Sequence, residues 1–112
     1  MQVTFTEGGP AVVGQISGSI DGLTAEALQA ALNGELHKGN HRIVADFSGV
    51  DYTSSAGLRV ILATVKEARR AGGDFRLAAV RPPVMRVLEL SGFGNVLKIF
   101  PDTQAALASF AT

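Results

Sequence analysis

The 112-residue sequence contains no cysteine and no tryptophan, and aromatic residues make up only 6% of it. Without cysteine the chain forms no disulfide and carries out no thiolate chemistry, which fits a reducing compartment. Ten basic and ten acidic residues give a net charge of zero, so charge favours neither nucleic acid nor an anionic membrane as a partner. No apolar run approaches the roughly 18 residues that span a bilayer, and the N-terminus lacks the features of a signal peptide. We expect a cytoplasmic protein without membrane insertion.

Groups that catalyse reactions are also scarce. The two histidines, His37 and His41, flank a Gly-Asn turn and are interpreted as solvated surface residues. No Cys/His cluster has metal-ligand spacing, and no G-x-x-x-x-G-K-[ST] loop is present for nucleotide phosphates. The Ser55-Ala56-Gly57 segment resembles the end of a G-x-S-x-G nucleophile elbow, but Thr53 replaces the first glycine and no histidine follows the serine. We therefore expect no enzyme, no cofactor and no metal.

The pattern of apolar residues predicts one α/β domain over residues 1–112. Hydrophobic residues make up 46% of the chain and charged residues 18%, a balance typical of globular domains. The element order β-β-α-β-α-β-α-β-α predicts a mixed, mainly parallel sheet with an antiparallel N-terminal strand and four helices. The expected strands are 2–6, 11–17, 42–47, 74–80 and 96–100, and the helices follow residues 22, 55, 81 and 102.

Helical spacing predicts which faces of the first two helices are buried. In the first helix the apolar positions are Leu23, Ala27, Leu28, Ala31 and Leu32, with either Asp21 or Thr24 as the cap. In the second helix the spacing places Leu58, Ile61, Leu62 and Val65 on the core face, with Val60, Ala63 and Glu67 pointing away from it.

A cluster of hydroxyl groups, Thr53, Ser54 and Ser55, directly precedes the second helix. Serine and threonine cap helix N-termini, and a phosphate is also well tolerated at this positive end of the helix dipole. From the residues alone, capping is the favoured interpretation and a modifiable hydroxyl is the alternative. Three acids, Asp21, Asp46 and Asp51, form either turns and caps, which is favoured, or a nucleotide-binding or hydrolytic site at the strand ends.

Residues 46–62, DFSGVDYTSSAGLRVIL, resemble the signature of STAS domains, a family named for sulfate transporters and anti-sigma factor antagonists. Upstream, GSIDGLTA at 18–25 resembles the family's G-x-[IL]-D-x-x-[TN]-A stretch. Downstream, GGDFRL at 72–77 and VMRVLELSGF at 84–93 resemble its later strand and helix. The resemblance covers nearly the whole chain and implies a single STAS domain with the STAS-type fold.

The resemblance implies an anti-sigma factor antagonist, a transcription regulator that works by partner switching and catalyses nothing. Such a protein binds an anti-sigma factor, which is a serine kinase, when it is unphosphorylated. The kinase then phosphorylates a serine of the antagonist and releases the antagonist, and a serine phosphatase returns the antagonist to its unphosphorylated state. Alignment on Gly57-Leu58 places the acceptor at Ser55, with Ser54 as the alternative. Known antagonists have Asp where Ser54 stands, and commonly Ser or Thr in place of Ala56.

The expected partner-binding surface surrounds this serine. Arg59 is expected to pair with the phosphate or with partner carboxylates, and an outward Val60 would supply an apolar contact. The alternative function is a structural STAS subunit of a transport or signalling complex, in which Ser55 is only a helix cap. The predicted partner-binding residues are Asp21, Thr53, Ser54, Ser55, Ala56, Gly57, Arg59, Val60 and Ala63.

Overall fold

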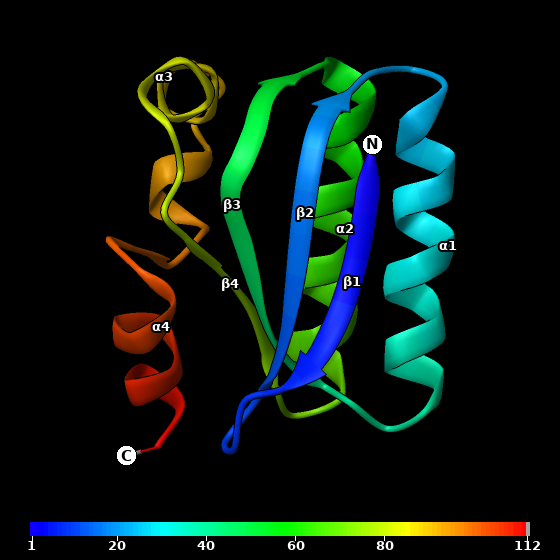
Figure 1. Ribbon diagram of the computed structural model, residues 1–112, viewed down its shortest axis with the longest axis vertical. Helices are drawn as coiled ribbons and strands as arrows, with labels where there is room; N and C mark the ends of the chain where they lie inside the picture. The colour runs from blue at the N-terminus through cyan, green and yellow to red at the C-terminus, as the bar shows by residue number, and fades with distance from the viewer. Residues whose placement is uncertain (112) are drawn as a thin grey trace.

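The computed structural model describes residues 1–111, in which strands and helices alternate after an opening hairpin (Figure 1). The strands are β1 (Gln2–Glu7), β2 (Val12–Ile20), β3 (Arg42–Thr53), β4 (Asp74–Ala78) and β5 (Ile99–Phe100). The helices are α1 (Thr24–His37), α2 (Ser55–Arg70), α3 (Pro82–Leu90) and α4 (Thr103–Phe110), with a 3-10 turn η1 (Phe93–Asn95) after α3.

The strands form one sheet in the order β1-β2-β3-β4-β5. Strand β1 pairs antiparallel with β2, as a hairpin requires, and the other neighbours are parallel. The helices between parallel strands supply the crossover connections that parallel pairing needs. The predicted mixed, mainly parallel sheet with four helices is confirmed.

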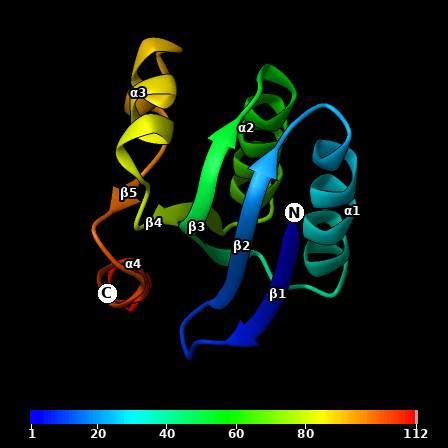
Figure 2. The same ribbon diagram turned by 45° about the horizontal axis from the view of Figure 1, so that its top comes forward.

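Strand β3 divides the hydrophobic core because its successive side chains point to opposite faces of the sheet. Ile43, Ala45 and Phe47 belong to the larger core cluster, which the buried faces of α1 and α2 complete. Val44 belongs to a second cluster with Ala106 of α4. Figures 1 and 2 show α1 and α2 side by side, with α4 well apart from both. The protein therefore has three layers, with the sheet in the middle.

Strands β2 and β3 are longer than the sequence predicts. The second and third strands were expected to end at residues 17 and 47, but β2 continues to Ile20 and β3 continues to Thr53. The two strands stay paired over this added length, but the pairing is irregular. Its register shifts between residues 15 and 17 and again between residues 18 and 19 of β2. Ile20 and Thr53 are therefore partners at the ends of their strands, which brings the loops that follow them to the same edge.

Two later strands are shorter than predicted. Strand β4 ends at Ala78 because Ala79 adopts a left-handed backbone conformation, with φ of 56°. Strand β5 keeps only Ile99–Phe100, since η1 occupies the chain just before it. On α3, Val84 and Leu88 are buried, whereas Leu90 is 83% exposed.

The predicted faces of α1 and α2 need correction at three positions. Leu23 is 88% exposed and Ala27 is exposed, because α1 begins at Thr24 and turns Ala25, Leu28 and Leu32 toward the core. Val60 was predicted to point to solvent, and that prediction is wrong: it is only 5% exposed. Helix α1 packs beside α2, so the flank of α2 that turns away from the sheet is covered by a neighbouring helix.

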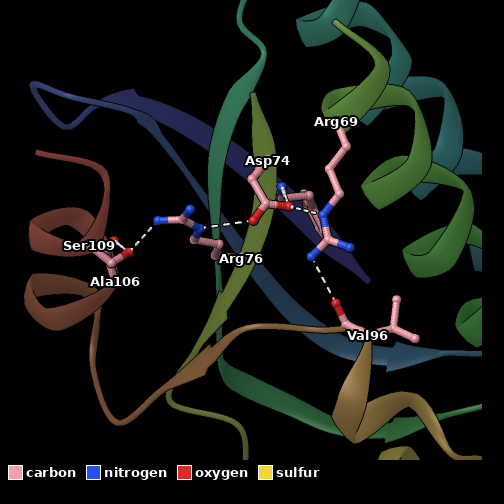
Figure 3. A network of polar contacts seen from close by, with 7 residues as sticks. Arg69, Asp74, Arg76, Val96, Ala106 and Ser109 are labelled. Atoms are coloured by element: carbon pink, nitrogen blue, oxygen red, sulfur yellow. Dashed lines mark hydrogen bonds and ion pairs between the residues drawn. The ribbon is translucent and has the colours of Figure 1, made fainter. Parts of the chain in front are cut away.

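A polar network ties the end of α2 to β4 and α4 (Figure 3). The buried carboxylate of Asp74 accepts hydrogen bonds from Arg69 Nε at 2.8 Å and from Arg76 Nε at 3.0 Å. Arg76 also donates to Ser109 Oγ at 2.7 Å, and its guanidinium lies 3.9 Å from the ring centroid of Phe110. Burial acts to raise the pKa of Asp74, but the hydrogen bonds from Arg76, Arg69 and the Phe75 N–H outweigh it and lower that pKa.

Candidate functional site

The N-terminus of α2 separates the roles of its two serines. Ser54 has an extended backbone, with ψ of 175°, and its hydroxyl oxygen accepts a hydrogen bond from the Gly57 N–H at 3.3 Å. This is the geometry of a helix N-cap. Ser55 is the first residue of the helix itself. The capping function is therefore performed by Ser54 and not by Ser55.

The Ser55 side chain is exposed to solvent. Within residues 1–111, no hydrogen bond or ion pair involves its hydroxyl. The backbone N–H groups of the first helical turn lie beside it, and such groups lack partners within the helix. The hydroxyl is thus reachable from outside and is not needed to hold the fold together.

The start of α2 is fixed tightly against the ends of β2 and β3. The Ser54 N–H donates to the carbonyl of Ile20 at 2.8 Å. A Cβ added to Gly57 would overlap Thr53 Oγ1 and would lie 2.7 Å from Ile20 Cγ2, so only glycine permits this approach of helix to strand. Thr53 and Gly57, which were predicted to contact a partner, are both buried at the start of α2.

Asp21 caps α1 through a reciprocal pair of hydrogen bonds with Thr24. The Asp21 carboxylate accepts from the Thr24 N–H at 2.9 Å and from the Leu23 N–H at 2.9 Å, and Thr24 Oγ1 accepts from the Asp21 N–H at 2.8 Å. The hydrogen bonds from the Thr24 backbone and hydroxyl lower the pKa of Asp21. Of the two caps that the sequence left open, the side chain of Asp21 is the one that binds the helix end. The arrangement is a capping box.

The other two acids of the predicted set serve separate local structures. Asp51 accepts a hydrogen bond from Ser19 Oγ at 2.9 Å, which links β3 to β2. Asp46 accepts from the Ser48 N–H at 2.9 Å within β3. In the described part of the chain, no group of three or more His, Asp or Glu residues could hold a metal ion. Of the three acids, only Asp21 has the predicted role of a cap. Asp46 and Asp51 lie within β3, so the prediction of turn and cap roles is wrong for these two.

Arg59, Ala56 and Ala63 lie along a shallow groove between α1 and α2, with a volume of about 370 Å³. Arg59 is exposed, and Ala56 and Ala63 are half-buried. Glu26 of α1 lines the same groove. The groove begins beside Ser55 and has one cation and one anion along its sides. Val60 contributes only to its floor, since its side chain is buried.

Two exposed apolar residues near this site were missed by sequence reasoning. Leu23 was assigned to the core, and Tyr52, which is 52% exposed, was given no role. The Asp21-to-Thr24 spacing of the capping box is the signal that would have placed Leu23 in the first turn and outside the buried face of the helix. For Tyr52 the sequence offered no such signal.

None of the helices in residues 1–111 is long and apolar enough to span a membrane.

Comparison with known proteins identifies the family. The STAS domain family matches residues 2–106. The Bordetella bronchiseptica protein BtrV, provisionally named an anti-sigma factor antagonist, is 35% identical over 112 residues, covering 100% of this chain and 97% of BtrV.

Solved structures give the same result for the fold. An anti-sigma factor antagonist from Mycobacterium paratuberculosis has a TM-score of 0.90 at 26% identity, covering 99% of this chain and 94% of that one. The anti-sigma factor antagonist SpoIIAA in its unphosphorylated form has a TM-score of 0.81 at 19% identity, covering 99% and 98%. The phosphorylated form of Bacillus SpoIIAA has a TM-score of 0.75 at 19% identity, covering 96% and 98%. The match over residues 2–106 and the similarity to BtrV over the whole chain show that this protein belongs to the STAS domain family, among members named as anti-sigma factor antagonists.

Proposed function

We propose that the protein is an anti-sigma factor antagonist controlled by phosphorylation of Ser55. In its unphosphorylated state it binds an anti-sigma factor that is also a serine kinase, and so frees the sigma factor. The kinase transfers the γ-phosphoryl group of ATP to Ser55 Oγ, whose proton is lost, and ADP leaves. A serine phosphatase hydrolyses the phosphoserine and restores the binding form. The chain is a binding module and a kinase substrate.

One observation carries this proposal: the Ser55 hydroxyl is exposed at the start of α2 while Ser54 caps the helix. A kinase must reach its acceptor oxygen, and a modified side chain must not be required by the fold. Ser55 meets both conditions. The relatives that carry the name anti-sigma factor antagonist supply the class of partner.

Ser54 is the weaker candidate for the acceptor. Its oxygen already accepts a hydrogen bond from the Gly57 N–H, and its side chain is half-buried. Phosphorylation there would require the cap to rearrange at the point where the helix is pressed against Ile20 and Thr53. Phosphorylation of Ser55 leaves that contact unchanged.

The physical basis of release is charge placed inside an interface. A phosphoryl group adds about −1.5 to −2 charges and three acceptor oxygens. On the free protein this charge faces water beside the N-terminus of α2, which is favourable. In the complex the same charge must lose its water, and it is repelled by any nearby partner carboxylate. We therefore expect phosphorylation to weaken the complex much more than it changes the stability of the protein.

The proposal is tested with a purified anti-sigma factor kinase from the same genome. Incubation with the kinase and Mg-ATP should place one phosphoryl group on the wild type and on Ser54→Ala, and none on Ser55→Ala, as measured by mass spectrometry. Ser55→Ala should bind the kinase as the wild type does, whereas Ser55→Asp should bind more weakly. Equal binding by Ser55→Asp and wild type, or phosphorylation elsewhere, would count against the switch.

The same variants separate this function from a structural role in a larger assembly. If Ser55→Ala cells control the sigma factor normally in response to the signal, phosphorylation of Ser55 has no regulatory role. We expect instead that the antagonist in those cells stays in its binding form, so that the sigma factor is active whether or not the signal is present.

A further inference from the structure

Large apolar side chains are exposed at few positions of residues 1–111. They are Leu23, Tyr52, Leu90 and Val96. Two of the four, Leu23 and Tyr52, lie in the segments that meet at the start of α2. Tyr52 pairs in register with Ser19 at the end of β2, and Ser54 is hydrogen-bonded to Ile20. Gly22, the neighbour of Leu23, lines the same groove as Ala56.

The backbone that presents Leu23 is held in place. Its N–H donates to the Asp21 carboxylate at 2.9 Å, and the next residue, Thr24, completes the capping box. A leucine that is 88% exposed on such a fixed turn offers its whole side chain to a partner, and binding orders little additional backbone.

Tyr52, near the end of β3, also lies on a backbone that is held in place. It belongs to β3, whose pairing with β2 fixes its backbone, and it is followed directly by the buried Thr53. Half of its side chain faces solvent. Tyrosine is one of the residues that most often dominate binding energy at protein interfaces, because it buries a large rigid ring at low entropic cost.

Leu23 and Tyr52 belong to the segments that meet at the start of α2, where Ser55 lies, and this arrangement bears on how a phosphate weakens binding. A charge in a wet, polar interface is screened and costs little, whereas a charge next to apolar surface from which water is excluded costs much more. Apolar side chains at the edge where α2 begins would create such surroundings when a partner covers this edge. The effect of phosphorylation therefore depends on what flanks the serine as well as on the serine.

We propose that Leu23 and Tyr52, which lie on the two segments that meet at the start of α2, are the two anchors by which the anti-sigma factor holds this protein. The proposal rests on the function proposed above. It specifies the partner's surface: apolar recesses for a leucine and a tyrosine ring, together with a neutral contact over Ser55. In this proposal the two anchors supply the binding affinity, and the uncharged serine allows the partner to cover them.

The test measures the dissociation constant of each variant with the purified anti-sigma factor kinase by isothermal titration calorimetry. Leu23→Ala and Tyr52→Thr should each weaken binding by about tenfold or more, as removal of an interface anchor does. Tyr52→Phe, which keeps the ring, should bind within about threefold of wild type. The matched control is Val96→Ala. Val96 is 37% exposed, but its carbonyl accepts from Arg69 near the far end of α2, and its replacement should leave binding unchanged.

The outcomes separate this inference from the proposed function. If the wild type binds and Ser55→Asp does not, while Leu23→Ala and Tyr52→Thr bind as tightly as wild type, the anchors are wrong and the switch stands. If the wild type does not bind the kinase, both proposals fail. A wild-type dimer that Leu23→Ala converts to monomer would assign the pair to self-association, which also overturns the inference. Unchanged melting temperatures of the variants confirm that folding is intact.

Discussion

The hydroxyl oxygen of Ser54 and the backbone N–H of Gly57 are joined by a 3.3 Å hydrogen bond that caps α2 and leaves the next serine unengaged. Gly57 is also the residue that allows α2 to approach Ile20 and Thr53 closely. Ser54 and Gly57 therefore fix the start of this helix, and the exposed hydroxyl of Ser55 lies between them in the sequence. The helix cap and the proposed phosphorylation therefore involve different side chains, although these side chains are adjacent in sequence.

This division predicts unequal effects of two similar substitutions on stability. Ser54→Ala removes the cap and should lower the free energy of unfolding by about 1 kcal/mol, the typical cost of losing a serine cap. Ser55→Ala removes an exposed hydroxyl without a partner and should change it by less than about 0.5 kcal/mol. Urea denaturation of both variants checks this. A larger loss for Ser55→Ala than for Ser54→Ala would mean that the capping roles are reversed.

Gly57→Ala should destabilise the protein although alanine favours helices. The added Cβ would collide with Thr53 Oγ1 and Ile20 Cγ2, and overpacking of this kind costs about 1–3 kcal/mol. Gly34→Ala, in α1, is the control because nothing lies within 4 Å of its added Cβ. It should stabilise the protein by about 0.5–1 kcal/mol through helix propensity. Thermal unfolding should thus move in opposite directions for the two variants.

Arg59 should lower the second pKa of a phosphate on Ser55. Arg59 is four residues after Ser55 on the exposed part of α2, a spacing that brings side chains together on a helix surface. A guanidinium near the phosphate favours the dianion, whose ordinary pKa is about 6. In phosphoserine-55 protein carrying Arg59→Gln, a phosphorus-31 NMR titration should therefore show a higher pKa than in the Arg59 protein, and Arg59→Lys should restore much of the difference. Identical titrations would show that the two groups do not interact.

Asp74 should contribute stability that disappears in acid. Its folded pKa is lowered, so the contribution is present above the unfolded pKa of about 4 and is lost as pH falls through the folded value. Asp74→Asn breaks a buried pair with Arg69 and Arg76 and should cost about 3 kcal/mol at pH 7. Denaturation between pH 7 and pH 3 should show a smaller loss of stability for Asp74→Asn than for wild type. Parallel pH profiles would contradict this account of the network.

The sequence predicted the order of strands and helices because that order depends on local patterns, and it predicted a helix start at the hydroxyl cluster because hydroxyls before an apolar helix indicate one. It failed where distant segments decide the outcome. Val60 lies on a flank of α2 that is polar in a simple helical projection, but α1 covers it. Strand β3 is extended by irregular pairing with β2, which composition does not reveal.

The Asp74 network also depends on contacts between distant parts of the sequence. Arg69 donates hydrogen bonds to Asp74 of the next strand and to the carbonyl of Val96, 27 residues away. Contacts at such separation depend on the folded topology, so no window of neighbouring residues contains them. Leu23 is different, because the Asp21–Thr24 capping box that places it in the exposed first turn is a local pattern that can be found in the sequence.

The central claim is tested most directly by comparing one protein in two states. Wild-type protein phosphorylated only at Ser55, and the same preparation after phosphatase treatment, are titrated with the purified anti-sigma factor kinase. We predict that the dephosphorylated protein binds and that phosphorylation raises the dissociation constant by about 100-fold or more, as expected when a charge is buried without a partner in an interface. Equal dissociation constants for the two states would contradict the account.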